Sequence, residues 1–489
     1  MNYNPSLYEI NTRVFVKRFG AETKITNVPP VFWNELAEKG IDYVWLLGIW
    51  KTSDEVIEKY CFEDDLVNSY KRALRDFKKE DVIGSPFSID VYDVNPKLAD
   101  ADSLIELKSF LNSRGIKLIL DFVPNHFGAG TSLLKTHPEI FLQVDEESFL
   151  KDPHTYFKPF AGKEIYFAHG RDPFFPSWQD TIQINIFSKD AREFLTDTLL
   201  RLTDVCDGVR CDMAMLLLNN VFKNTWIGAL SKNHFHLHEK EFWSEAISAV
   251  KNKRADFIFI AESYWDMEWE LQQLGFDFTY DKKLTDRLRT GYVKDICEHL
   301  LAEESYQKRS LRFIENHDEE RAAASFGKEK SKAAAIIIST IQGMRFYHDG
   351  QLEGKKIKLP VQLGREPEEF FPNGIHDFYD RLFSITQEKT FKHGNWKLLR
   401  PGPAWEGNIS HNNMLAWEWN YNDEKRVVVV NYSESVSVSL LKLDVSGYPE
   451  NFELLDLLND QTYIRSSEEV YHTGLYIELK PWQAHILKY

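Results

Sequence analysis

Short apolar runs alternate with amphipathic stretches along the first 390 or so residues of the chain. Apolar runs of four to eight residues are typical of strands, and apolar positions that recur every three or four residues are typical of helices. Helices are predicted over residues 31–39, 102–113 and 191–202, among others. The predicted strands cover residues 7–15, 43–47, 118–123, 208–212, 257–262, 276–280, 311–316 and 344–348.

Strands that alternate with helices favour a parallel sheet, and eight of them indicate a closed (β/α)₈ barrel. An open doubly wound sheet has the same local pattern. It would also carry a glycine-rich phosphate-binding turn after its first strand, and this sequence has none there. The pattern therefore predicts the barrel.

Two stretches interrupt this rhythm. Residues 50–85 are highly charged and are predicted to form a helical excursion. Residues 127–185 are aromatic and contain several prolines, among them Pro153, Pro159, Pro173 and Pro176, and this stretch is too long for a structureless loop. We expect it to form a small subdomain over the active-site face, in which residues 169–178 are either a lid or a packed Ω-loop.

The pattern changes again after about residue 399. Strand patterns over 427–430, 435–440 and 475–479 have no helices between them, which predicts an antiparallel β-domain, a sandwich by its spacing. The predicted organisation is then a barrel, an inserted subdomain and a C-terminal β-sandwich. Their ranges are 1–126 with 186–398, 127–185, and 399–489, respectively.

Charge and composition exclude several classes of protein. The 59 basic residues against 75 acidic ones give a net charge of −16, so the basic footprint of a nucleic-acid binder is absent. The four cysteines form no CxxC pair and no cluster with histidines, which favours free thiols. The 34 Phe, 21 Tyr and 13 Trp fit either a large core or a cleft lined by rings.

The first residues have neither a basic segment nor an apolar segment typical of an export signal. No apolar run approaches the roughly 20 residues that span a bilayer. These features predict a cytoplasmic protein with no membrane partner. They do not indicate an oligomeric state.

Polar residues stand at the ends of four of the predicted strands. In a (β/α)₈ barrel the chemistry lies at the C-terminal ends of the strands. A single carboxylate there often just caps a helix or pairs with an arginine. Polar groups at the same end of four strands indicate an active site. They are Asn125 and His126, Arg210 and Asp212, Glu262, and His317 and Asp318.

These residue types suit the cleavage of a glycosidic bond with retention of configuration, which needs one carboxylate as nucleophile and one as acid. Arg210 and Asp212 are two apart on a strand, so they share a face, and the guanidinium would keep Asp212 ionised. Glu262 follows the apolar run 257–261, and partial desolvation would keep it protonated. His317 and Asp318 offer a donor and an acceptor to sugar hydroxyls.

The four segments, in this order and on the third, fourth, fifth and seventh strands, resemble the signature regions of the α-amylase family of glycoside hydrolases (family 13). The resemblance covers nearly the whole chain. It implies that Asp212 is the nucleophile, that Glu262 is the general acid/base and that Asp318 is the third carboxylate. It also implies substrate binding by His126, Arg210 and His317, with Phe87 in place of a ring-stacking tyrosine, and a structural role for Asp121.

Besides Phe87, the sequence departs from the family at three further positions. Met215 and Leu216 replace a lysine and a histidine that follow the nucleophile in many amylases. Gln183 stands where an aspartate often helps to hold calcium, a cation that prefers charged oxygen ligands. We therefore predict no cofactor and no required metal, and Asn125 is left as the one candidate calcium ligand.

The resulting prediction is a retaining α-glycoside hydrolase that acts on α-glucans or malto-oligosaccharides, with short soluble substrates preferred. A transglycosylase or sugar isomerase with the same carboxylates is the alternative. A metal phosphohydrolase built on His317 and Asp318 would need further ligands. A barrel kept only as a binding module would have lost carboxylates, and all three are present.

Overall fold

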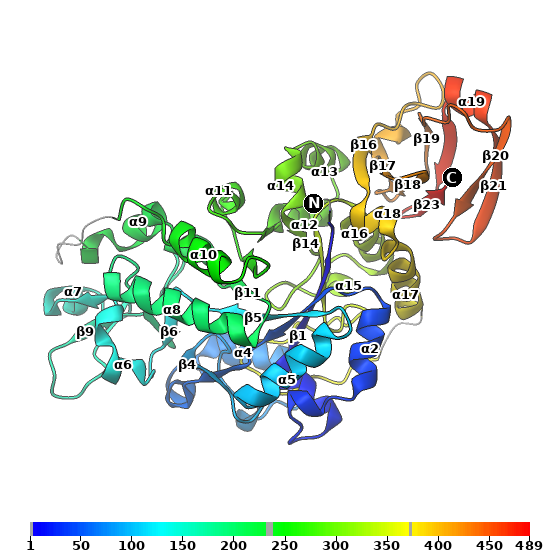
Figure 1. Cartoon of the computed structure of the whole chain (residues 1–489). Helices are drawn as coiled ribbons and strands as arrows, with labels where there is room; N and C mark the ends of the chain where they lie inside the picture. Colours follow the sequence, from blue (N-terminus) through cyan, green and yellow to red (C-terminus); the bar gives the residue numbers. More distant parts are fainter. Residues whose placement is uncertain (1–2, 231–237, 371–373) are drawn as a thin grey trace.

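A closed barrel of eight parallel strands lies at the centre of the protein (Figure 1). The computed structural model describes residues 3–230, 238–370 and 374–489. Around the barrel the strands follow the order β1, β2, β5, β11, β12, β13, β14, β15 and back to β1, so the predicted (β/α)₈ fold is confirmed. Their bounds are β1 (Ser6–Asn11), β2 (Tyr43–Leu47), β5 (Lys117–Phe122), β11 (Gly208–Cys211), β12 (Ile258–Ala261), β13 (Phe278–Tyr280), β14 (Ser310–Arg312) and β15 (Met344–His348).

The first strand is shorter than predicted. β1 ends at Asn11, and a helical turn, α1 (Thr12–Phe15), and a 3-10 turn, η1 (Val16–Phe19), follow it. Val14 and Phe15 are apolar because they are buried beside the barrel, and not because the strand continues. The prediction of a strand over residues 7–15 was therefore wrong beyond Asn11.

Alternate residues of each strand point into the barrel, as the two-residue period of a strand requires. The inward side chains include Leu7, Trp45, Ile260, Leu311 and Phe346, which form one buried apolar cluster. The remaining side chains of the strands face the surrounding helices. Any charged side chain on the inward face of the barrel is therefore an exception to this apolar lining.

Helices cover the outside of the barrel, and those predicted over 31–39, 102–113 and 191–202 are confirmed to within a few residues. Asp100 and Ser188 cap two of them, accepting from the backbone N–H groups of Ser103 and Ala191. No helix among the described residues is both long and apolar enough to cross a membrane. The main helices are α2 (Pro30–Glu38), α5 (Ala101–Asn112), α8 (Lys189–Val205), α9 (Asn219–Leu230), α10 (Phe242–Lys253), α12 (Lys282–Thr290), α13 (Val293–Leu300), α16 (Lys328–Thr340) and α17 (Ile375–Thr386); shorter ones are α11 (Glu268–Gln273), α14 (Glu304–Lys308), α15 (Ala322–Ser325) and α18 (Lys389–His393).

Both interruptions of the barrel pattern are structured. In the first, β3 (Trp50–Thr52) pairs with β4 (Ile89–Val94), and helices α3 (Ile57–Tyr60) and α4 (Asp64–Ala73) lie between them. In the second, the stretch after β5 forms two small antiparallel sheets and two short helices. These elements are β6 (His126–Gly128) with β10 (Thr181–Gln183), β7 (Gln143–Val144) with β9 (Tyr166–Ala168) and β8 (Tyr156–Phe157), α6 (Leu133–Thr136) and α7 (Glu146–Lys151).

The C-terminal part is a β-sandwich. A six-stranded sheet, β16-β17-β18-β23-β20-β21, faces the two-stranded sheet β19-β22, and residues of both sheets share one apolar core. Trp417 and Trp419, on the opposite face of the larger sheet, belong instead to the core shared with the barrel. The bounds are β16 (Asn395–Leu399), β17 (Met414–Tyr421), β18 (Glu424–Asn431), β19 (Ser437–Leu441), β20 (Asn451–Asp456), β21 (Gln461–Ser466), α19 (Ser467–His472), β22 (Leu475–Leu479) and β23 (Ala484–Lys488).

Candidate active site

Asp212 and Glu262 meet at one buried guanidinium at the C-terminal end of the barrel. Arg210 is 1 % exposed and lies on β11. Its Nη1 is 2.7 Å from Asp212 Oδ1, and its Nη2 is 2.7 Å from Glu262 Oε2. The register of the neighbouring strands, in which Cys211 is level with Ala261, brings the two carboxylates to the same height. The structure thus places both predicted catalytic carboxylates side by side.

Glu262 is held by three donors. Besides Arg210, the backbone N–H of Met213 donates to Oε2 (2.7 Å) and the Tyr264 hydroxyl donates to Oε1 (2.9 Å). Burial raises the pKa of Glu262 to about 7, even though Arg210 acts in the opposite direction. Burial likewise raises the pKa of Asp212, and the charge of Arg210 opposes this increase.

The backbone of Met213 is left-handed, with φ 42° and ψ 47°, which is an uncommon conformation for a residue with a side chain. This turn directly follows Asp212 and points the N–H of Met213 at Glu262. Backbone strain of this kind persists where the surrounding structure enforces it, often at functional sites.

Asp318 lies at the rim of the site. Its side chain is 46 % exposed, whereas those of Asp212 and Glu262 are 7 % and 4 % exposed. Burial of the group would raise the pKa of Asp318, but the positive charge of His317 outweighs this effect and holds it well below its usual range. His317 Nε2 is 3.0 Å from Asp318 Oδ2. A cavity of about 580 Å³ adjoins both residues and is also lined by Arg72, Lys356 and Lys358.

The predicted substrate-binding residues belong to the same site. The Phe87 ring is 5.4 Å from the His317 ring and 5.2 Å from the Arg210 guanidinium. His126 bonds to the backbone of Phe87, and burial lowers its pKa to about 3, so its imidazole is neutral. The structure therefore brings together all seven predicted site residues: Arg210 lies on β11, His126 on β6, Phe87 just before β4, and the other four in the segments that follow β11, β12 and β14.

Asp121 lies below this site and positions Arg210. It accepts from Trp45 Nε1 and from the backbone N–H of Gly48, both at 3.2 Å, and its Oδ1 is 3.6 Å from Arg210 Nη1. Burial raises the pKa of Asp121 to about 7. With 2 % exposure it has no access to a substrate, which agrees with a structural role.

The residues around Asn125 do not fit a calcium ion. The side-chain nitrogen of Gln183 is 2.8 Å from the backbone oxygen of Asn125, 3.0 Å from its side-chain oxygen and 3.0 Å from the backbone oxygen of Ile184. A cation would need these oxygens, and an amide N–H₂ group occupies their centre. Within the described ranges no group of three or more His, Cys, Asp or Glu side chains could hold a metal ion.

Met215 and Leu216, which replace two polar residues of many amylases, are buried in the core at 0 % and 2 % exposure. The segment 169–178 of the insert contacts α9 and the loop that follows β12. Arg171 donates to the backbone oxygen of Thr225 (2.5 Å) in α9, and the ring of Phe174 contacts that of Trp265 edge-on at 4.9 Å. The insert thus makes contact with the loop that follows Glu262.

Three aromatic residues, Tyr264, Trp265 and Trp269, follow Glu262 closely along the chain. Tyr264 contacts Glu262 directly, and Trp265 contacts Phe174. Trp269, within α11, is 42 % exposed, and its ring lies 6.5 Å from that of Tyr306. Only Tyr264 and Trp265 therefore belong to the site.

One buried acidic residue of the site was not predicted from the sequence. Glu9, on β1, is fully buried and bonds to His317. Its signal in the sequence is weak: it is an acidic residue within the apolar run of β1, on the same face as Leu7. The partner is 308 residues away along the chain.

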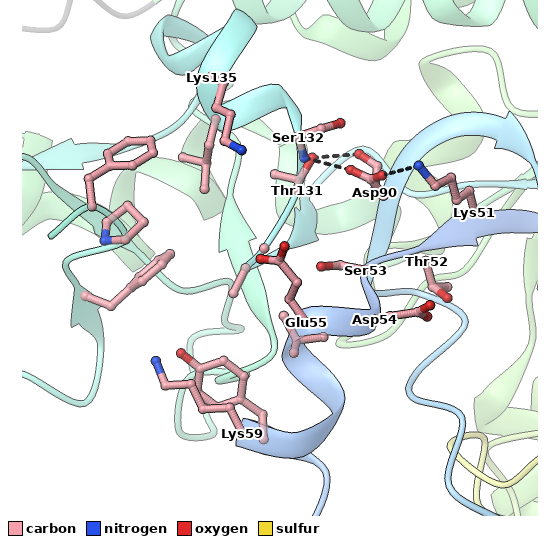
Figure 2. A pocket seen from close by; sticks show the side chains of 18 of the residues that line it. Lys51, Thr52, Ser53, Asp54, Glu55, Lys59, Asp90, Thr131, Ser132 and Lys135 are labelled. Carbon is pink, nitrogen blue, oxygen red and sulfur yellow. Dashed lines mark hydrogen bonds and ion pairs between the residues drawn. The ribbon is translucent and has the colours of Figure 1, made fainter.

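A second hollow, of about 520 Å³, lies between the segment 51–60 and the insert, and Figure 2 shows its lining. None of the seven predicted site residues lines it. Asp90 lies at the edge of this hollow. Its carboxylate accepts a hydrogen bond from the N–H of Ser132 (2.7 Å) and forms an ion pair with Lys51 (2.9 Å). These contacts anchor the insert to β3 and β4.

Comparison with known protein families agrees with this geometry. A family model described as the α-amylase catalytic domain matches residues 85–370, which is more than half of the chain. The chain belongs to the α-amylase family. The matched range contains all the predicted site residues and excludes the C-terminal sandwich.

Curated relatives of this family are distant. An α-amylase from Dictyoglomus thermophilum is 22 % identical over 395 residues, which cover 70 % of this chain and 73 % of that protein. The α-amylase MalA from Haloarcula japonica is 22 % identical over 73 % of this chain and 49 % of its own length. A cyclomaltodextrinase from Thermoanaerobacter pseudethanolicus is 21 % identical over 82 % of this chain and 64 % of its own. The chain thus spans only about half to three quarters of these relatives.

Solved structures share the whole architecture. A maltogenic α-amylase, AmyB, from Thermotoga neapolitana superposes over 100 % of this chain and 99 % of its own, with a TM-score of 0.67 and 18 % identity. An α-amylase from Lactobacillus plantarum superposes over 99 % of both chains, with a TM-score of 0.67 and 18 % identity. At this identity the likeness shows the fold, including the C-terminal β-domain.

Proposed function

We propose that this protein is a retaining α-glycoside hydrolase that acts on α-glucans and prefers short malto-oligosaccharides. The observation that carries the proposal is that Asp212 and Glu262 share the two amino groups of Arg210. Two carboxylates so placed can act on one glycosidic bond, one as nucleophile and one as acid.

In the proposed first step a carboxylate oxygen of Asp212 attacks the anomeric carbon of the sugar and forms a covalent bond to it. Glu262 donates its proton to the glycosidic oxygen, and the bond to the leaving sugar breaks. Oε2 of Glu262 already accepts from Arg210 and Met213, so the proton belongs on Oε1, beside the Tyr264 hydroxyl. A raised pKa keeps this carboxyl protonated near neutral pH.

In the second step Glu262 takes a proton from water, and the resulting nucleophile releases the sugar from Asp212 with its original configuration. Asp318 accepts hydrogen bonds from sugar hydroxyls, and His317 and the neutral His126 flank the same sugar. The Phe87 ring offers a flat apolar face to it. No step in this scheme needs a metal, and the Gln183 amide at Asn125 supports a protein that does not depend on calcium.

The contact between Phe174 and Trp265 supports the preference for short substrates. It joins the insert to the loop after Glu262 and so narrows the cleft on the side where the leaving sugar departs. A long glucan would have to pass this aromatic pair, whereas a chain of two or three sugars would not.

The test is incubation of the protein with maltose, maltotriose, maltoheptaose, isomaltose, trehalose, sucrose and soluble starch. Products are resolved by chromatography, and the first anomer released is read by NMR. We expect α-configured products from α-linked malto-oligosaccharides. Initial release of the β-anomer would contradict retention, and products longer than the substrate would favour the transglycosylase alternative, which the names of the relatives do not favour.

A further inference from the structure

Glu9 is an ionisable side chain inside the barrel wall that the proposed reaction does not yet use. It is 0 % exposed and lies two residues after Leu7, on the inward face of β1. Burying a carboxylate without a partner is costly, so such groups persist where they are paired. The partner of Glu9 therefore indicates what this residue does.

That partner is His317. Glu9 Oε1 accepts a short hydrogen bond from Nδ1 of His317, and on the other side of the ring Nε2 is 3.0 Å from Asp318 Oδ2. The contact between Nε2 of His317 and Asp318 is an ion pair, since Nε2 has no hydrogen-bond partner with suitable geometry. An ionised carboxylate can only accept hydrogen bonds. An imidazole that lies between two carboxylates therefore interacts most favourably when each ring nitrogen carries a proton.

The other groups around His317 do not offer an alternative partner. The Trp45 ring lies edge-on at 5.5 Å and the Phe87 ring at 5.4 Å. Asp121 and Asp212 act on His317 through their charge, from β5 and β11. Arg210, whose guanidinium lies 5.0 Å and 5.2 Å from the Trp45 and Phe87 ring centres, is the cation on the same side.

On the β15 side, His348 Nε2 is 3.9 Å from Oε2 of Glu9, which is too long for a hydrogen bond. His348 turns its other nitrogen towards Arg321 (2.9 Å) and Glu315 (3.5 Å). Glu9 thus binds through Oε1, and it binds His317. Burial alone would lower the pKa of His317, but the charges of Asp318 and Glu9 outweigh burial and hold it well above its ordinary value.

We propose that Glu9 is a positioning residue: it holds His317 as an imidazolium in a fixed plane, and through His317 it orients the carboxylate of Asp318 towards the substrate. The part that concerns substrate rests on the proposed function. The contact between Glu9 and His317 does not. A half-exposed Asp318 needs such an anchor, since solvent would otherwise let its side chain rotate away from the sugar.

Glu9→Gln tests the charge without changing the shape of the side chain. The imidazolium then loses one of its two anions, so its proton should be lost at a lower pH. We expect kcat on maltotriose to fall about ten- to a hundredfold, less than when the carboxylate that orients a histidine base is removed. The loss of activity on the alkaline side of the pH profile, which deprotonation of Glu262 causes in the wild type, should become steeper in Glu9→Gln, because His317 then loses its proton there as well.

The direct measurement is the titration of His317 by NMR in protein labelled with ¹⁵N-histidine, with its signals assigned by their loss in His317→Gln. We expect His317 to stay doubly protonated to pH 8 in the wild type and to titrate at least about one unit lower in Glu9→Gln. The matched control is Glu315→Gln, which removes a buried carboxylate that pairs with Arg321 and His348 and does not contact His317. It should leave the His317 titration unchanged.

A wild-type His317 that titrates near 6.5 would overturn the proposal, as would equal titrations in Glu9→Gln and the wild type. If Glu9→Gln does not fold, the wild-type titration decides together with Glu9→Asp, which keeps the charge but withdraws it from Nδ1 and should lower kcat more than it changes KM. Absence of any hydrolysis by the wild type would contradict the proposed function, while the titration would still report on Glu9 and His317.

Discussion

The side-chain nitrogen of Gln183 lies 2.8 Å from the backbone oxygen of Asn125 and 3.0 Å from its side-chain oxygen. Both residues are 1 % exposed, so an amide takes the place that a hard cation would need. The difference matters because the stabilisation by a bound ion rises with the logarithm of the ion's concentration, whereas the stabilisation by an internal amide does not depend on any ion.

We therefore expect dialysis against EDTA to leave the melting temperature and the activity unchanged, and added calcium to have no effect. Differential scanning calorimetry with and without chelator measures this. A drop of many degrees that calcium reverses would show a calcium site and contradict the prediction.

Gln183→Ala should lower the free energy of unfolding by about 1–3 kcal/mol, because it removes the amide that donates to the buried side-chain oxygen of Asn125 and to the backbone oxygen of Ile184. Urea unfolding followed by fluorescence gives this value. Gln179→Ala, in the same insert but more exposed, is the control and should cost less than about 1 kcal/mol.

Asp212→Asn should abolish turnover while the fold stays intact, because attack on the anomeric carbon needs an ionised carboxylate. Glu262→Gln should lose much less activity on aryl glycosides with good leaving groups than on maltotriose, since only the latter needs a proton donor. The ratio of kcat/KM on the two substrates measures this. Equal losses on both would show that Glu262 is not the acid.

The activity should fall as the pH rises through about 7. Glu262 donates a proton, so the enzyme is active while this carboxyl is protonated, and burial raises its pKa to about 7. The rate is then lost above pH 7, and it also falls at acid pH where Asp212, whose pKa burial raises, becomes protonated. The apparent value belongs to the pair with Asp212, because the two groups interact. The measurement is kcat/KM on maltotriose from pH 4 to pH 9, and a flat profile between pH 6 and pH 8.5 would contradict this assignment.

Phe174→Ala should widen the cleft at the contact with Trp265. We expect kcat/KM on maltoheptaose to rise relative to maltotriose by about two- to tenfold, the range that corresponds to one ring-to-ring contact. Phe175→Ala is the control, since Phe175 is 68 % exposed and Phe174 67 %, but of the two only Phe174 has a ring contact with Trp265. If both variants shift the ratio equally, the contact does not set chain-length preference.

The parts of the site that could be predicted are those carried by local patterns. Arg210 and Asp212 are two residues apart on a strand, so their shared face follows from the strand period. The replacement of a charged calcium ligand at position 183 could be predicted because it depends only on the residue type there, which is glutamine. The four strand ends could be aligned because parallel strands all point the same way.

The parts that could not be predicted depend on contacts between distant segments. Nothing near Glu9 in the sequence indicates His317, and nothing near Phe174 indicates Trp265. The end of β1 was overestimated for a related reason: Val14 and Phe15 are buried by neighbours that the local pattern does not reveal. Periodicity reports that a residue is buried, but not which element buries it.

The larger C-terminal sheet has one further consequence. Alternate residues of β17 point into two different cores: Met414 and Ala416 into the sandwich, and Trp417 and Trp419 into the barrel. The Trp419 indole also donates to the backbone oxygen of Thr340 at the end of α16 (2.6 Å). The barrel and the sandwich are therefore joined by a shared apolar interface that contains both tryptophans. The barrel and the sandwich should unfold in a single thermal transition. Neither domain could be replaced with that of a relative unless the residues of the interface were replaced as well.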